Sequence, residues 1–110
     1  MSRPRGAVRE GVGEVVDAHV HYWDPVSRAY PWLEELPALR HAFGPDDFRR
    51  ASSGVPVAGR IFVECNCASD AAVEEARAMS ALVEEEELLG IVAFADLTRP
   101  GELRGTLDEY

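Results

Sequence analysis

Residues 60–95 constrain the fold most, because their pattern predicts a strand, a helix and a second strand in succession. Residues 60–65 and 91–95 are short apolar segments of the kind that form buried strands. Between them, residues 69–87 repeat apolar side chains at spacings of three and four, which predicts an amphipathic helix that Gly90 ends. A strand, a helix and a strand in this order predict parallel strands joined by a right-handed crossover. The expected fold class is therefore α/β.

The predicted helix has two faces of opposite character. Its buried face is formed by Val73, Ala76, Met79, Leu82 and Val83. The opposite face carries Glu74, Glu75, Arg77 and the acidic residues 84–87. Charges that gather on one face of an amphipathic helix are typical of a solvated surface, so we expect these carboxylates to be exposed.

Shorter elements flank this unit. Residues 14–20 form an apolar, strand-like segment, and residues 45–52 begin with a proline and two carboxylates that favour a short helix. Residues 100–109 resemble the start of another helix. Residues 1–11 show no periodicity and are expected to be a flexible lead-in. The expected domain therefore spans residues 12–110.

Length and charge exclude several classes of protein. A chain of 110 residues is enough for one domain but well short of the roughly 250 residues of a complete (β/α)8 barrel. Eleven basic and 20 acidic residues give a net charge of −9, which argues against nucleic-acid and membrane partners. Without a secretory signal or a membrane span, the expected location is cytoplasmic, where Cys65 and Cys67 stay free thiols.

Polar side chains gather where each predicted strand ends. Alternation along the first strand predicts that Asp17, His19 and His21 share one side. Alternation along the second strand places Glu64 on the same side as Phe62 and Asn66, leaving Ile61, Val63 and Cys65 to face a covering helix. The third strand ends at Asp96 in the same way. Because the carboxyl ends of parallel strands carry the sites of α/β proteins, these residues predict a site.

The His-x-His pair is the sharpest feature of this predicted site. Two neutral imidazoles about one strand repeat apart can bind one divalent cation, although a zinc site needs at least one further protein ligand. The alternative is a hydrogen-bonded structural pair. Trp32 and Glu64 are the candidate substrate-binding residues. Trp32 could instead be a packing residue, and Glu64 could instead be a carboxylate paired with a structural partner. Asp96 is a candidate for the further metal ligand, and its alternative role is to cap a loop.

Five segments follow one another along the chain. They are VDAHVHYWDP at 16–25, YPWL at 30–33, GPDDF at 44–48, IFVEC at 61–65 and GIVAFADL at 90–97. Together they resemble the amidohydrolase-related family, and in particular its sugar-lactonase branch, from about residue 15 to residue 107 and in the order that the branch shows. The branch includes L-fuconolactonases, L-rhamnonolactonases and 2-pyrone-4,6-dicarboxylate lactonases.

The resemblance implies the amino-terminal part, about three strands, of a (β/α)8 barrel of the metal-dependent hydrolase type. His19 and His21 would be metal ligands, with zinc as the expected ion, although some relatives work without metal. The small-molecule substrate would be a lactone, and the general base would lie beyond residue 110. We therefore expect the isolated chain to be inactive and poorly stable. The alternatives are a decarboxylase of the same superfamily and a non-catalytic α/β module; the oligomeric state is left open.

Overall fold

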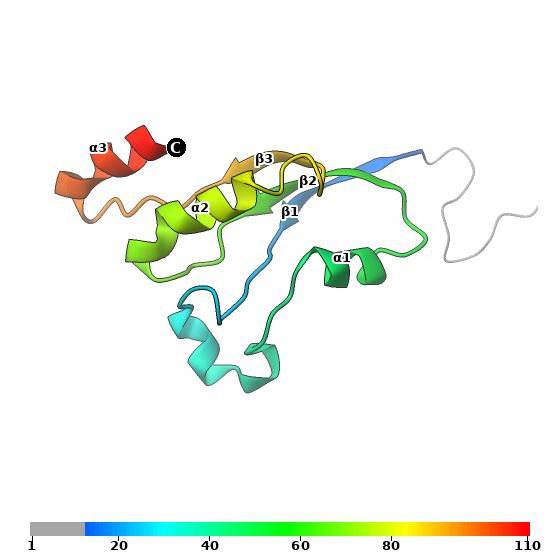
Figure 1. Ribbon diagram of the computed structural model, residues 1–110, viewed down its shortest axis with the longest axis horizontal. Coiled ribbons are helices and arrows are strands. Elements are labelled where there is room, and N and C mark those ends of the chain that lie inside the picture. Colours follow the sequence, from blue (N-terminus) through cyan, green and yellow to red (C-terminus); the bar gives the residue numbers. More distant parts are fainter. Residues whose placement is uncertain (1–12) are drawn as a thin grey trace, which may run out of the picture.

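The computed structural model describes residues 13–110, which form one parallel sheet with helices between its strands (Figure 1). The predicted lead-in, residues 1–11, and the domain boundary at residue 12 lie outside the described residues. The strands are β1 Val15–Val20, β2 Val57–Val63 and β3 Leu88–Val92, in the spatial order β1-β2-β3. The helices are α1 Pro45–Ala51, α2 Ala72–Ser80 and α3 Pro100–Glu109, with short 3₁₀ helices at Pro31–Glu35, Pro37–Leu39 and Ser69–Ala71.

Both strand pairings are parallel, as the alternation of strands and helices predicts. β2 lies in the middle, with β1 on one side and β3 on the other. α1 connects β1 to β2, α2 connects β2 to β3, and α3 follows β3 (Figure 1). The α/β fold class is confirmed, and three successive parallel strand–helix units are compatible with part of a (β/α)8 barrel.

The core lies on one face of the sheet, and this face is opposite to the predicted one. Phe62 is only 1% exposed and packs with Val20, Tyr22, Met79 and Leu88. The side of β2 that carries Phe62 therefore faces the helices, and its neighbours on the other side are only partly buried. Cys65 is nevertheless buried, because β2 ends at Val63 and strict alternation does not continue beyond the strand.

The second helix is shorter than predicted. α2 ends at Ser80 instead of residue 87, and β3 begins at Leu88, so that Gly90 lies inside the strand instead of ending the helix. Two carboxylates expected on the solvated face are buried: Glu75 is 2% exposed and Glu86 is 4% exposed. Tertiary contacts of the Glu86 side chain outweigh the helix propensity of the glutamate-rich segment.

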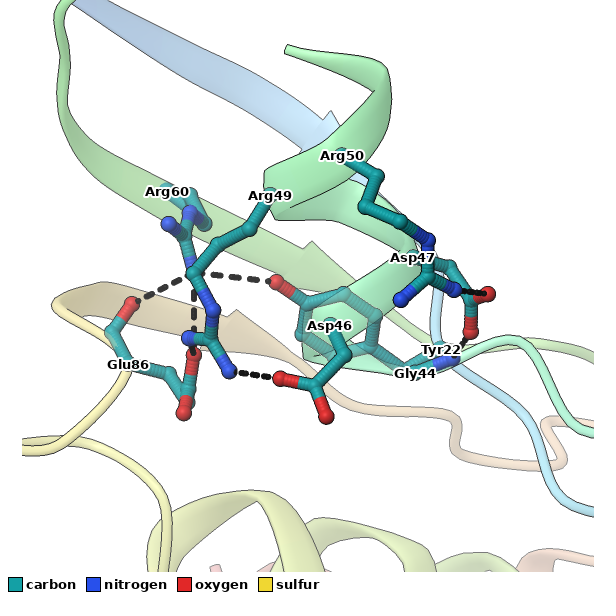
Figure 2. Close-up of polar contacts among 8 residues, drawn as sticks. All are labelled: Tyr22, Gly44, Asp46, Asp47, Arg49, Arg50, Arg60 and Glu86. Carbon is teal, nitrogen blue, oxygen red and sulfur yellow. Dashed lines mark hydrogen bonds and ion pairs between the residues drawn. The ribbon is translucent and has the colours of Figure 1, made fainter. Parts of the chain in front are cut away.

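Glu86 is the centre of a buried cluster of polar contacts (Figure 2). The Arg60 guanidinium donates to the Glu86 carboxylate at 3.3 Å, to the Glu86 carbonyl at 3.1 Å and to the Tyr22 hydroxyl at 3.3 Å. Arg49 from α1 pairs with the same carboxylate. Arg60 also lies 4.4 Å above the centre of the Phe48 ring. The cluster thereby joins β2, α1, the segment after β1 and the segment before β3.

Two further expectations concern the whole described chain. Cys65 and Cys67 are free and buried, as predicted. Within residues 13–110, none of the helices is long and apolar enough to cross a membrane.

Candidate functional site

The two predicted histidines lie where β1 ends, on the face opposite the helices. His19 and His21 are exposed, and they alternate with Val20 and Tyr22, which are buried in the core. Asp17 does not share their side. Between Asp17 and Val20 the strand advances three residues while its partner β2 advances two, so this irregularity shifts the alternation by one residue. The prediction that Asp17 joins the pair is therefore wrong.

The two imidazoles converge. His19 Nε2 and His21 Nε2 are 3.2 Å apart, and the ring planes meet at 71°. His21 Nδ1 lies 2.8 Å from the Val63 carbonyl oxygen. Because a carbonyl can only accept a hydrogen bond, Nδ1 of His21 carries the proton. Neutral His21 therefore has its lone pair on Nε2, the atom that faces His19.

This arrangement fits two ligands of a metal ion, and it also fits the alternative of a hydrogen-bonded pair in which His19 Nε2–H donates to His21 Nε2. Two nitrogens at ~2.05 Å from a tetrahedral zinc ion stand roughly 3.3 Å apart, close to the separation seen here. A carbonyl that fixes the tautomer through the other ring nitrogen is typical of metal-binding histidines. Among residues 13–110, however, no group of three or more His, Cys, Asp or Glu side chains could hold an ion. A complete ligand set would need groups beyond these residues.

A hollow of about 260 Å³ opens beside His21. It contains both candidate substrate-binding residues, Trp32 and Glu64. The complete lining is His21, Trp23, Trp32, Glu64, Cys65 and Asn66. The Trp23 and Trp32 rings meet edge to face at 5.4 Å, and Trp32 Nε1–H donates to the Cys65 carbonyl at 2.8 Å. The hollow thus combines an aromatic wall with polar groups, as sites for small molecules do.

Glu64 has a structural partner at the edge of this hollow. Its Oε1 accepts a hydrogen bond from Asn66 N–H at 2.6 Å. Asn66 has a φ of 52°, in the left-handed region that asparagine tolerates better than most residues. Asp96 instead accepts hydrogen bonds from Thr98 N–H and the Thr98 hydroxyl, so it caps its loop and is not brought to the histidines.

The thiols of Cys65 and Cys67 are poor nucleophiles. Burial raises the pKa of Cys65 to about 12 and that of Cys67 to about 11, with the nearby Glu75 adding to both shifts. The Cys65 thiol donates to the Tyr22 carbonyl at 3.2 Å. Both cysteines therefore stay protonated near neutral pH, which fits the expected role of small buried groups.

One residue near the site was missed from the sequence. Glu75 reaches from α2 to the end of β2, where its Oε2 accepts Cys65 N–H at 3.3 Å. Burial raises the pKa of Glu75, while the Cys65 hydrogen bond and the charge of Arg28 act in the opposite direction. The sequence did contain a signal for its burial: Glu75 stands at helical spacing from Ala72, Ala76 and Met79, which form the buried side of α2.

Comparison with solved structures gives an informative similarity. The fold is similar to an amidohydrolase 2 from Bifidobacterium longum subsp. infantis, with a TM-score of 0.62 and 32% sequence identity. The match covers 73% of this chain but only 32% of the other, so this chain spans about a third of that protein's length. No family model and no curated protein matches. The similarity supports a relationship to the amidohydrolases at the level of the superfamily.

Proposed function

We propose that this chain forms the amino-terminal part of a (β/α)8 barrel hydrolase that opens a sugar lactone or a related cyclic ester. The observation that carries the proposal is the imidazole pair at the carboxyl end of β1, with Nε2 of His21 turned toward Nε2 of His19 at 3.2 Å. This end of a parallel strand is where barrel enzymes place their catalytic groups. The similarity to an amidohydrolase 2 supports the same type of enzyme.

His19 and His21 would hold a divalent ion, with zinc as the expected metal. Once bound there, such an ion supplies a Lewis acid for the lactone carbonyl. In a metal-free site, the same two imidazoles would lie beside that carbonyl. Under either alternative, the Val63 carbonyl keeps the Nδ1 proton of His21 in place and leaves Nε2 for the site.

Trp32 and Glu64 would bind the substrate ring in the neighbouring hollow. The indole offers an apolar face for a sugar ring, and its hydrogen bond to the Cys65 carbonyl fixes its orientation. One oxygen of Glu64 accepts Asn66 N–H, and the other can accept a sugar hydroxyl. The base that deprotonates the attacking water would lie on a later strand, beyond residue 110. The isolated chain is therefore expected to be inactive.

Zinc binding tests the proposal. We expect a metal-free barrel, completed with the remaining strands, to take up one Zn²⁺ per molecule in a titration calorimeter, because residues 13–110 do not supply a full ligand set by themselves. The double variant His19→Ala, His21→Ala should lose this binding. His41→Ala is the matched control, because His41 is an exposed histidine in a different loop. Equal zinc uptake by the double variant and the control would contradict the metal site.

Activity tests the reaction class separately. The chain alone should not hydrolyse sugar lactones, whereas a barrel completed with the remaining strands should do so. Turnover by the completed barrel should fall by roughly 100-fold or more in the double histidine variant, the effect typical of losing a group that acts on the reacting atoms. A completed barrel that folds, binds no zinc and hydrolyses no lactone would favour the non-catalytic module.

A further inference from the structure

Glu75 is a buried carboxylate that the proposed reaction does not use. It lies on the side of α2 that packs against the sheet and is 2% exposed. Its Oε2 accepts the backbone N–H of Cys65 at 3.3 Å. A carboxylate is costly to bury, so a group placed here in spite of that cost calls for a physical explanation.

The segment that Glu75 contacts, residues 63–65, holds several parts of the site. The Val63 carbonyl accepts the Nδ1 proton of His21 at 2.8 Å. The Cys65 carbonyl accepts the indole N–H of Trp32 at 2.8 Å. The Cys65 thiol donates to the carbonyl of Tyr22 at 3.2 Å. The direction of this short segment therefore decides where two side chains of the hollow point.

The sheet itself does not hold this segment in place. The Glu64 N–H still donates to Val92 in β3, at 2.9 Å, but β2 ends at Val63. Two residues beyond Glu64, the backbone of Asn66 adopts a φ of 52° and the chain leaves the strand direction. The Cys65 N–H therefore points away from the ladder, toward α2, where Glu75 accepts it. Without that acceptor, a buried backbone donor would be left unpaired.

We propose that Glu75 is a positioning residue for the imidazole pair. By accepting Cys65 N–H, its carboxylate fixes residues 63–65, so that the Val63 carbonyl keeps the proton of His21 on Nδ1 and Nε2 faces His19. The inference deepens the proposed function, because it concerns the same two histidines. It does not depend on whether they bind zinc or a carbonyl, because it concerns which nitrogen of His21 carries the proton.

The tautomer of His21 tests this role directly. Long-range ¹H–¹⁵N spectra of the neutral imidazoles should show the Nδ1–H form in the wild-type chain, in buffer with sucrose to favour the folded state. Glu75→Met keeps the volume but removes the acceptor, and it should shift His21 toward a mixture of both tautomers. Glu75→Gln keeps an acceptor oxygen and should restore the wild-type form. Glu84→Met is the matched control, because Glu84 is an exposed glutamate just beyond the end of α2.

A folded Glu75→Met variant with the wild-type His21 tautomer would overturn the inference. Where that variant loses its dispersed spectrum, Glu75→Asp replaces it, because it keeps the charge but is one methylene too short to reach Cys65. An unchanged tautomer in a folded Glu75→Asp variant would overturn the inference equally.

Zinc affinity gives a second readout and separates the two proposals. Loss of a group that orients a ligand typically weakens metal binding by 10–100-fold. In the completed barrel we therefore expect about a 10-fold loss for Glu75→Met and little change for Glu75→Gln or Glu84→Met. If the completed barrel binds no Zn²⁺ while the His21 tautomer still depends on residue 75, the metal site fails and the positioning role stands. If Zn²⁺ binds equally to all variants with an unchanged tautomer, the positioning role fails alone.

Discussion

Glu75 is a buried carboxylate, and the free energy needed to keep its charged form buried makes the stability of the chain depend on pH. Burial raises its pKa, and the hydrogen bond from Cys65 and the charge of Arg28 offset only part of the rise. The folded chain therefore binds the Glu75 proton more tightly than the unfolded chain does. This contribution to stability is fully present below the ordinary glutamate pKa of ~4.3 and is lost as the pH rises through the raised folded value.

Glu75→Gln should remove this pH dependence. The amide keeps an acceptor for Cys65 N–H but has no charge to bury. The free energy of unfolding of the variant should therefore increase relative to that of the wild type as the pH rises toward neutral. Urea unfolding over a series of pH values measures the difference between the two curves. The carboxyl groups of Asp47 and Asp96, whose pKa values are lowered by their hydrogen bonds, act equally in both proteins and cancel.

The control for this prediction is Glu84→Gln, which replaces an exposed carboxylate just beyond the end of the same helix. Its difference from the wild type should stay nearly constant with pH. A Glu75→Gln difference that is equally flat would show that burying this carboxylate carries no cost.

At the level of single residues, the sequence predicted the imidazole pair but not its surroundings. His19 and His21 could be predicted because alternation holds from Val20 to Tyr22. Asp17 could not, because a strand irregularity appears only when the partner strand is known. Glu75 was assigned to the wrong face of its helix because charge was taken to indicate exposure, and a buried backbone donor at Cys65 overrides that rule.

At the level of the elements, the Arg60–Glu86 cluster (Figure 2) decides where α2 ends and β3 begins. Glu86 is 4% exposed and receives hydrogen bonds from Arg60, which is itself 5% exposed. For this contact the chain leaves the helix after Ser80 and returns to the sheet through Glu87, whose φ is 55°. The run of four glutamates favours a longer helix locally, so this boundary depends on a partner distant in sequence and could not be predicted from periodicity.

Glu86→Ala should destabilise the chain by about 3 kcal/mol, because it leaves the Arg60 charge buried without a carboxylate. Glu85→Ala is the matched control on an exposed neighbour and should change stability by less than about 0.5 kcal/mol. Replacing both partners, as in Arg60→Met with Glu86→Leu, should recover most of the loss, since no unpaired charge remains. Urea unfolding followed by circular dichroism measures all three. A Glu86→Ala variant as stable as Glu85→Ala would contradict this role.

At the level of the whole molecule, both edges of the sheet are open among residues 13–110. β1 and β3 each pair with β2 on one side only. The parallel order was predictable from the sequence, because each strand and helix carries its own periodicity. Whether anything covers the free edges was not, because the periodicity of an element does not reveal its edge partners. The amidohydrolase 2 to which the chain is similar extends well beyond the matched third.

Open edges and exposed apolar side chains predict self-association of the isolated chain. Leu89 is 64% exposed and Val92 is 51% exposed, and both lie on β3, whose outer edge has unpaired backbone groups. The net charge of −9 opposes association, so added salt should favour it by screening. In sedimentation velocity, the average sedimentation coefficient should rise with protein concentration. Lysine on an edge strand blocks such pairing, and the double variant Leu89→Lys, Val92→Lys should stay monomeric.

The control must carry the same added charge away from the sheet. Leu107→Lys meets this condition, because Leu107 is 53% exposed but lies on α3. If the strand edge drives association, one lysine on α3 leaves the concentration dependence intact, whereas one lysine on β3, as in Val92→Lys, reduces it. If both single variants reduce it equally, the loss of an exposed apolar side chain is responsible and not the strand edge, because an added lysine lowers the net negative charge and would by itself favour association. If the wild-type chain stays monomeric at every concentration and salt level, the free edges are protected within the chain itself, and the need for further strands loses its main physical argument.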